Sequence, residues 1–342
     1  ALRVADGAVV VIDAGAGVDV GTERVWQFAE DQELPRLIFL NKLGREDADV
    51  EGTMEQVRER FGREAVALQM PVARGEGFKQ IVDLTRQKLV TYTDGKASEG
   101  DIPADLTDSA ATLREYLMEA IAETDEELME AYFGEGELDT QQMERGLRQA
   151  IATRQIFPVL CGDDFDNVGV DQLLSAVATY FPSPSQSPGL KYTNPAGDEM
   201  ALVGDADQPL VAFVFKTTAE QHVGELSYLR LYSGTLTHGD EVLNSSRNKT
   251  ERIGQIFELH GHERQEVDSA SAGDIVALVK LKDTHTGNTL CAKGSEYLLP
   301  NVESSEPLIR VAVTAKEKGG EDRMVTGLHA LAEEDPSFSF RF

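Results

Sequence analysis

The chain has 342 residues, a length that accommodates two or three domains, and its 60 acidic against 32 basic residues give a formal net charge of −28. This balance argues against a broad, sequence-independent grip on nucleic acid, although local basic patches remain compatible with docking on RNA. No run approaches the roughly 20 apolar residues that a membrane span requires, and the first residues lack the features of a signal peptide. The two cysteines, Cys161 and Cys291, lie far apart in the sequence, which favours a cytoplasmic protein.

The chain opens with a pattern typical of a parallel β-sheet. Residues 7–14 (GAVVVIDA) predict a strand covered on both faces, residues 22–33 a helix, and the run that ends at Leu40 a second strand. Such a βαβ unit places Asn41 at the carboxyl end of its strand, where open α/β sheets bind ligands. The alternative is an ordinary polar loop after a strand.

Residues 50–157 change to a mainly helical pattern. Apolar spacing predicts helices over 50–61, 113–132 and 139–153, and turns at Gly95-Lys96 and Asp101-Ile102-Pro103. A buried strand over 156–160 and a helix over 170–180 follow. The simplest interpretation is a helical subdomain inserted into an α/β sheet, after which the sheet resumes.

The second half of the chain has a β pattern. Residues 181–207 are rich in Pro, Ser, Gly and Asp and predict a linker. Short strands over 211–217, 224–243, 251–259 and 275–281 predict a small closed barrel. A strand over 308–314 and a helix over 321–334 then begin a further domain, so we expect the chain to stop early in that domain.

Short motifs in a fixed order resemble one family over almost the whole chain. They include VGTERVW, LPRLIFLNK, PVLCG, YFPSP, VGELSYLRLYSG, HGDEVLN, AGDIVALVKLKDTHTGNTLC and LAEEDPSF. In combination these resemble bacterial elongation factor G, the translocation GTPase. The resemblance implies the C-terminal part of an α/β G domain of the P-loop NTPase type (1–61 and 158–184) with an inserted helical or α+β subdomain (62–157). A linker (185–207), a β-barrel second domain (208–303) and the beginning of a ferredoxin-like α+β third domain (304–342) complete the expected order.

The resemblance also implies a function for the parent protein. A monomeric, cytoplasmic GTPase would bind GTP or GDP with magnesium and use the ribosome to couple hydrolysis to movement of tRNA and mRNA. Gly15-Ala16-Gly17 and Gly319-Gly320 lack the Lys-Ser/Thr of a phosphate-binding loop, so we expect that loop and both switches to precede Ala1 and this chain not to hydrolyse GTP. The alternatives are a diverged paralogue that acts as a ribosome-binding module with weak or relaxed nucleotide binding, and a ribosomal-protection or release-type relative.

The residues that the resemblance assigns to the guanine base depart from the family pattern. In the family's Asn-Lys-x-Asp, the Asn and Lys correspond to Asn41 and Lys42, whereas Gly44 replaces the Asp whose carboxylate accepts from guanine. Loss of that acceptor should cost about 2–4 kcal/mol, and Gly44→Asp in a full-length protein should tighten GDP binding. The second base loop is Gly162-Asp163-Asp164, where the family has Gly-Ser-Ala. Asp47 and Asp49 lie beyond the turn, so rescue by either would need a rearranged loop.

Other candidate sites carry weaker signals. His260-Gly261-His262 has no third ligand nearby for a metal, and Cys161 has no evident base that would make it a nucleophile. Adjacent carboxylates at 126–127 and 333–335 do not face each other on a helix and predict solvated surfaces. A basic cluster of Arg247, Lys249, Arg252 and Arg264 on the barrel is either an RNA contact or an ordinary hairpin surface.

Overall fold

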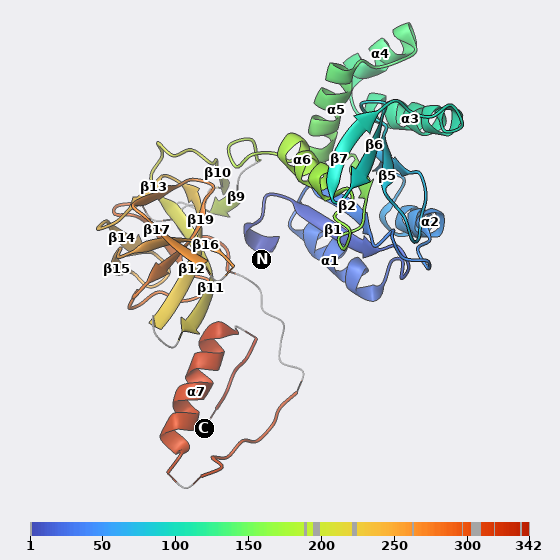
Figure 1. Cartoon of the computed structure of the whole chain (residues 1–342). Helices are drawn as coiled ribbons and strands as arrows, with labels where there is room; N and C mark the ends of the chain where they lie inside the picture. The colour runs from blue at the N-terminus through green and yellow to red at the C-terminus, as the bar shows by residue number, and fades with distance from the viewer. Residues whose placement is uncertain are drawn as a thin grey trace. The chain divides into compact units, whose positions relative to one another are not determined.

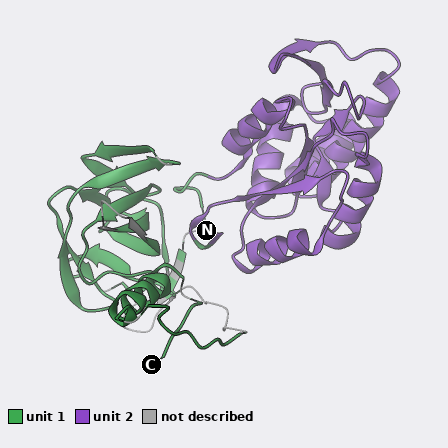
Figure 2. Ribbon diagram, turned by 60° about the horizontal axis from the view of Figure 1, so that its bottom comes forward, with its two compact units in different colours: residues 1, 3, 183–342 green, residues 2, 4–182 purple. Residues whose placement is uncertain are grey.

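The computed structural model describes residues 2–187, 190–193, 199–220, 224–261, 263–295, 297–301, 309–317, 319–335 and 337–341. The chain divides into two compact units, residues 4–182 and residues 183–342 (Figure 2). Each unit has its own hydrophobic core, and each is described separately below.

A four-stranded parallel sheet forms the centre of the first unit (Figure 1). Its strands are β1 (Ala8–Asp13), β2 (Arg36–Asn41), β8 (Phe157–Cys161) and β3 (Ala65–Ala67), in the order β1-β2-β8-β3. Every residue of β2 and β8 is buried, as the continuous apolar runs predict. The α/β interpretation of the first part of the sequence is confirmed.

Strand β1 corrects one detail of the sequence prediction. Val10 and Ile12 are buried, but Val9 and Val11 are 37% and 55% exposed, so only one face of the strand is covered within the described residues. Strand β1 is also the outermost strand of this sheet. A β-branched run predicts a strand, but it does not reveal how many neighbours cover that strand.

Capping residues explain where the helices of this unit begin. Asp19 precedes α1 (Val20–Asp31), and Asp49 precedes α2 (Val50–Phe61); each carboxylate accepts a backbone N–H of the first turn. Helix α6 (Val170–Tyr180) starts after Gly169, which adopts a left-handed φ of 79°. The predictions for α2 and α6 match the observed bounds.

The single helix predicted over 113–132 is wrong. The structure has α3 (Thr107–Ala122) and α4 (Glu126–Glu135) instead, followed by α5 (Thr140–Ala152). Asp125 separates the first two because its carboxylate accepts the N–H groups of Glu127 and Leu128 and thereby starts a new helix. An apolar stripe continues across this break, and for that reason the periodicity does not reveal it.

The insert is α+β rather than purely helical. Strands β4 (Gln69–Pro71), β5 (Gln80–Asp83), β6 (Lys88–Thr93) and β7 (Lys96–Gly100) form an antiparallel sheet in sequence order. Asp94 and Gly95 both have positive φ in the β6–β7 turn, which agrees with the predicted turn. Leu117, Ile121, Leu147 and Ile151 bury one face of the helices in a core that also includes Val82 and Leu89 of the sheet.

The second unit is mainly antiparallel β-structure. Its main sheet has the order β15-β14-β20-β11-β12-β19-β16-β17, and β13 pairs with β18. The bounds are β11 (Val211–Glu220), β12 (Gly224–Ser233), β13 (Thr235–Thr237), β14 (Glu241–Asn244), β15 (Lys249–Arg252), β16 (Ile256–His260), β17 (Glu263–Val267), β18 (Ser269–Ser271), β19 (Ile275–Val279) and β20 (Thr289–Ala292). Strands β17, β18 and β20 were not predicted; the sequences of the first two, ERQEV and SAS, are polar or small. A short pair, β9 (Leu190–Thr193) and β10 (Glu199–Leu202), lies within the predicted linker.

The end of the chain confirms a helix and contradicts a strand. Helix α7 spans Glu321–Glu334, as predicted. Residues 309–314 form no strand, and Ile309 and Val311 are 80% and 78% exposed; the remaining residue of the predicted strand, at 308, lies outside the described residues. A strand requires a partner for its backbone groups, and none pairs with this segment among the described residues.

Candidate functional site

The two loops that the resemblance assigns to a nucleotide base meet at the carboxyl edge of the parallel sheet. The β1–β2 register aligns Asp13 with Asn41, and the β2–β8 register aligns Leu40 with Cys161. The chain leaves β2 into residues 41–45 and leaves β8 into residues 162–168. The structure therefore brings together the predicted residues Asn41, Lys42, Gly44, Gly162, Asp163 and Asp164.

Backbone and side-chain hydrogen bonds tie these loops to each other. Asn41 is 7% exposed, and its Oδ1 accepts the N–H of Asp164 at 3.0 Å. The N–H of Gly162 donates to Leu40 O at 2.9 Å, and the N–H of Leu43 donates to Gly162 O at 3.2 Å. Asn41 thus links the two loops to each other.

Lys42 is held by an acidic residue that the sequence analysis did not identify. Its Nζ lies 2.8 Å from Asp13 Oδ2, and Arg45 Nη1 lies 3.8 Å from the same oxygen. The hydrogen bond from Lys42 is the main cause that lowers the pKa of Asp13, with burial opposing it. One feature of the sequence could have identified Asp13 as a site residue. It lies at the end of a predicted strand, next to the strand that ends at Asn41.

We predict that Asp13→Asn removes a pH-dependent contribution to stability. The native pKa of Asp13 lies below its unfolded value of about 3.9, so the charged form contributes above that value and the contribution disappears as the pH falls through the native pKa. Because the Asp13 and Lys42 side chains are 26% and 43% exposed, we expect a loss of at most about 1 kcal/mol at pH 7, which becomes smaller as the pH falls below about 3.9. Urea unfolding followed by fluorescence of Trp26, the single tryptophan, measures this in the first unit. An equal loss at pH 7 and pH 3 would contradict the prediction.

Gly44 and Asp163 contact each other, so the two departures from the family pattern are not independent. The N–H of Gly44 donates to Asp163 Oδ2 at 2.8 Å. Asp163 Oδ1 also accepts the N–H groups of Phe165 and Asp166 at 3.0 and 3.1 Å, and the residue is 4% exposed. The carboxylate at 163 therefore bridges the two loops from within.

Neither nearby aspartate replaces the missing acid at position 44. Asp47 forms two hydrogen bonds with the guanidinium of Arg45, at 2.9 and 2.8 Å. Asp49 accepts from the N–H of Gly52 and caps α2. Both carboxylates are therefore engaged with other groups.

The weaker candidates do not form a second site. Cys161 is buried, and burial raises the pKa of its thiol to about 12, which removes it as a nucleophile at neutral pH. His260 ends β16, while His262 lies outside the described residues; no group of three His, Cys, Asp or Glu side chains suited to a metal occurs in the described part of the chain. Arg247 and Lys249 lie at the β14–β15 hairpin, whereas Arg264 lies on β17 at the other end of the strand order.

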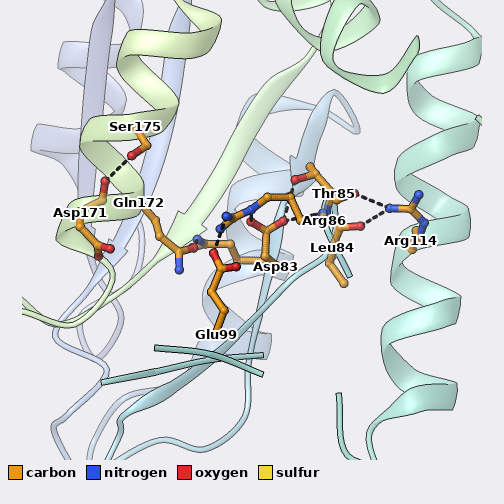
Figure 3. A network of polar contacts seen from close by, with 10 residues as sticks. Asp83, Leu84, Thr85, Arg86, Glu99, Arg114, Asp171, Gln172 and Ser175 are labelled. Carbon is orange, nitrogen blue, oxygen red and sulfur yellow. Dashed lines mark hydrogen bonds and ion pairs between the residues drawn. The ribbon is translucent and has the colours of Figure 1, made fainter. Parts of the chain in front are cut away.

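A cavity of about 380 Å³ lies between the insert and α6, and none of the residues of the two loops lines it. Arg86 joins Asp83 and Glu99 there, with Nε 2.7 Å from Asp83 and Nη1 2.6 Å from Glu99 (Figure 3). Asp171 of α6 accepts the hydroxyl of Tyr92 at 2.6 Å. The bonds of Arg86 lie within the β4–β7 sheet, whereas the Tyr92–Asp171 bond joins that sheet to α6.

Known proteins resemble the chain throughout its length. The family model for the elongation factor Tu GTP binding domain matches residues 1–183, that for elongation factor G domain 2 matches 209–293, and that for elongation factor G domain III matches 304–342. The crystal structure of a protein from Thermus thermophilus is 29% identical, with a TM-score of 0.85 over 99% of this chain and 49% of that chain. The chain thus spans about half the length of that relative.

These matches define the class of the first unit as a GTP-binding domain of the elongation factor Tu type. With its two following domains, the chain belongs to the elongation-factor-G-like translational GTPases. No helix in the described part of the chain has the length and apolar character needed to cross a bilayer.

The family implies a guanine nucleotide as ligand, and the residues at the sheet edge fit it only in part. Asn41 and Lys42 are present and held in place by Asp164 and Asp13. The third contact of the family is missing, because Gly44 offers no carboxylate; Asp163, the nearest acid to it, accepts three backbone N–H groups.

Proposed function

We propose that this chain supplies the base-binding side of the G domain and the adjoining domains of a ribosome-associated GTPase that drives translocation of tRNA and mRNA. The observation that supports this most directly is the meeting of the Asn41-Lys42 and Gly162–Asp164 loops at the carboxyl edge of the sheet, in a chain that matches three consecutive translation-factor domains. The proposed base contacts are Asn41, which orders the loops, and Lys42, whose stem would lie along the ring.

The nucleotide part of this proposal is tested by titration of the ¹⁵N-labelled chain with millimolar GDP. We expect amide shifts at residues 41–45 and 162–168, since both loops face the same edge. Ribose-5-phosphate serves as the control ligand without a base. Shifts confined to other regions, or none at several millimolar GDP, would count against a nucleotide site.

The ribosome part is tested by competition. No Gly-x-x-x-x-Gly-Lys-Ser/Thr sequence occurs in the 342 residues, so we propose that the chain alone does not hydrolyse GTP. It should nevertheless cosediment with ribosomes, and in excess it should slow puromycin-monitored translocation by an intact elongation factor G. Absence of both effects would argue against ribosome binding through these domains.

A second function is supported by the Gly44–Asp163 contact. A diverged paralogue would use the same domains as a ribosome-binding module with weak or relaxed nucleotide binding. It predicts ribosome cosedimentation without the GDP-induced shifts at residues 41–45. The same two experiments therefore separate the two functions.

A further inference from the structure

The carboxylate of Asp163 occupies the space that a side chain on Gly44 would enter. A Cβ atom placed at Gly44 would lie 2.7 Å from Asp163 Oδ2, the oxygen that accepts the Gly44 N–H at 2.8 Å. Contacts between a Cβ and an oxygen at that distance are essentially not found in proteins. An acidic side chain at 44 and the observed position of Asp163 therefore exclude each other.

The carboxylate of Asp163 has few lone-pair positions left that could accept a further hydrogen bond. A carboxylate offers about four lone-pair positions, and three are taken by the N–H groups of Gly44, Phe165 and Asp166. Oδ1 accepts two of these bonds and Oδ2 one. Oδ2 consequently retains a single position for a further donor.

We propose that the base-selective carboxylate of this site has moved from position 44 to Asp163, and that Asp163 reads a purine through one hydrogen bond instead of two. The inference rests on the proposed function and names the class of nucleotide that the site takes. A single acceptor pairs with the N1–H that guanine and hypoxanthine share, and it leaves the 2-amino group of guanine unread. It opposes the ring N1 acceptor of adenine.

The site is thus selective for 6-oxopurine nucleotides with N1–H, but it discriminates little between guanosine and inosine nucleotides. A charged bidentate acceptor would favour GDP over IDP by about tenfold or more, since each bond to a carboxylate contributes measurably. With one acceptor we expect GDP and IDP to bind within about threefold of each other and both to bind better than ADP.

The experiment compares the affinities of GDP, IDP and ADP for the unmodified chain and for four variants by ¹⁵N titration. Asp163→Asn replaces the spare acceptor with a donor, which suits the N1 acceptor of adenine, and should shift the preference from GDP toward ADP by about tenfold. Gly44→Asp combined with Asp163→Ser restores an acid at 44 without the clash and should raise GDP over IDP by about tenfold. Gly44→Asp alone places two carboxylates together and should weaken GDP binding, contrary to the expectation from sequence alone.

Glu46→Gln is the matched control, because it removes one negative charge from the same loop at an exposed position. Trp26 fluorescence during urea unfolding establishes that each variant is folded. If the variant that combines Gly44→Asp with Asp163→Ser does not fold, Asp163→Asn still tests the proposal, because it retains the Oδ1 acceptor. Unchanged nucleotide ratios in folded Asp163→Asn, with GDP still bound, would overturn the role of Asp163 and leave the proposed function standing. Binding of no nucleotide by any folded protein would overturn both.

Discussion

Replacement of Gly162 by alanine is expected to destabilise the first unit by about 3 kcal/mol, the upper part of the range for overpacking a rigid site. An added Cβ would lie 2.3 Å from Val168 O and 2.6 Å from Phe39 Cζ. Neither atom has room to move, since Val168 O accepts the N–H of Asp163 and Phe39 is 3% exposed in the core. The loop must shift, and the Asn41–Asp164 hydrogen bond should break with it.

Urea unfolding followed by Trp26 fluorescence measures this effect, because Trp26 stacks on Phe61 within the first unit. Gly134→Ala is the control: it lies in α4, nothing surrounds the added Cβ within 4 Å, and it should be neutral or stabilising by up to about 1 kcal/mol. A loss below about 0.5 kcal/mol for Gly162→Ala would show that the 162–168 loop adapts freely.

Replacement of Glu251 by alanine should destabilise the second unit by about 3–5 kcal/mol. Glu251 is 5% exposed, and its Oε1 accepts the N–H of Asp283 at 2.7 Å and of Lys282 at 3.1 Å and the hydroxyl of Thr284 at 3.0 Å. Alanine would leave these donors buried without an acceptor. The carboxylate therefore holds the segment between β19 and β20 against β15.

Hydrogen exchange of the Lys282 and Asp283 amides and calorimetric unfolding report this loss. Glu251→Gln keeps an oxygen at the Oε1 position, so it should lose distinctly less stability than the alanine variant. The Trp26 transition of the first unit should not change, since Trp26 lies in the other unit. Equal losses for glutamine and alanine would show that the charge, rather than the Oε1 hydrogen bonds, supplies the stability.

The sequence predicted those helices and strands that are marked by a capping residue or by a continuous apolar run. Helix α2 begins at a capping Asp49, and β8 is an uninterrupted apolar run, so both were found with nearly correct bounds. Strand β17 was not, because its stability comes from pairing with β16 rather than from its own polar sequence. The break at Asp125 was hidden because the apolar stripe continues on both sides of it.

In the candidate site, too, the local features were predicted from the sequence and the contacts between distant residues were not. Asn41 and Lys42 were predicted from a short motif, and Asn41 is the last residue of β2. The bond from Lys42 to Asp13 and the contact of Gly44 with Asp163 join residues that are far apart in the sequence. A single sequence without coordinates does not show that a change at 44 and a change at 163 share one space.

The separation of those loops along the chain has a consequence for the order of folding. Gly44 and Asp163 are 119 residues apart, and Asn41 and Asp164 are 123 apart, with the complete insert between them. Closing so long a segment is slow, and its entropic cost precedes any gain from the contacts that it allows. The bonds between the loops should therefore form late in refolding, after β8 has docked beside β2, and a polypeptide still being synthesised should acquire its base-facing edge only once residues beyond 166 are available.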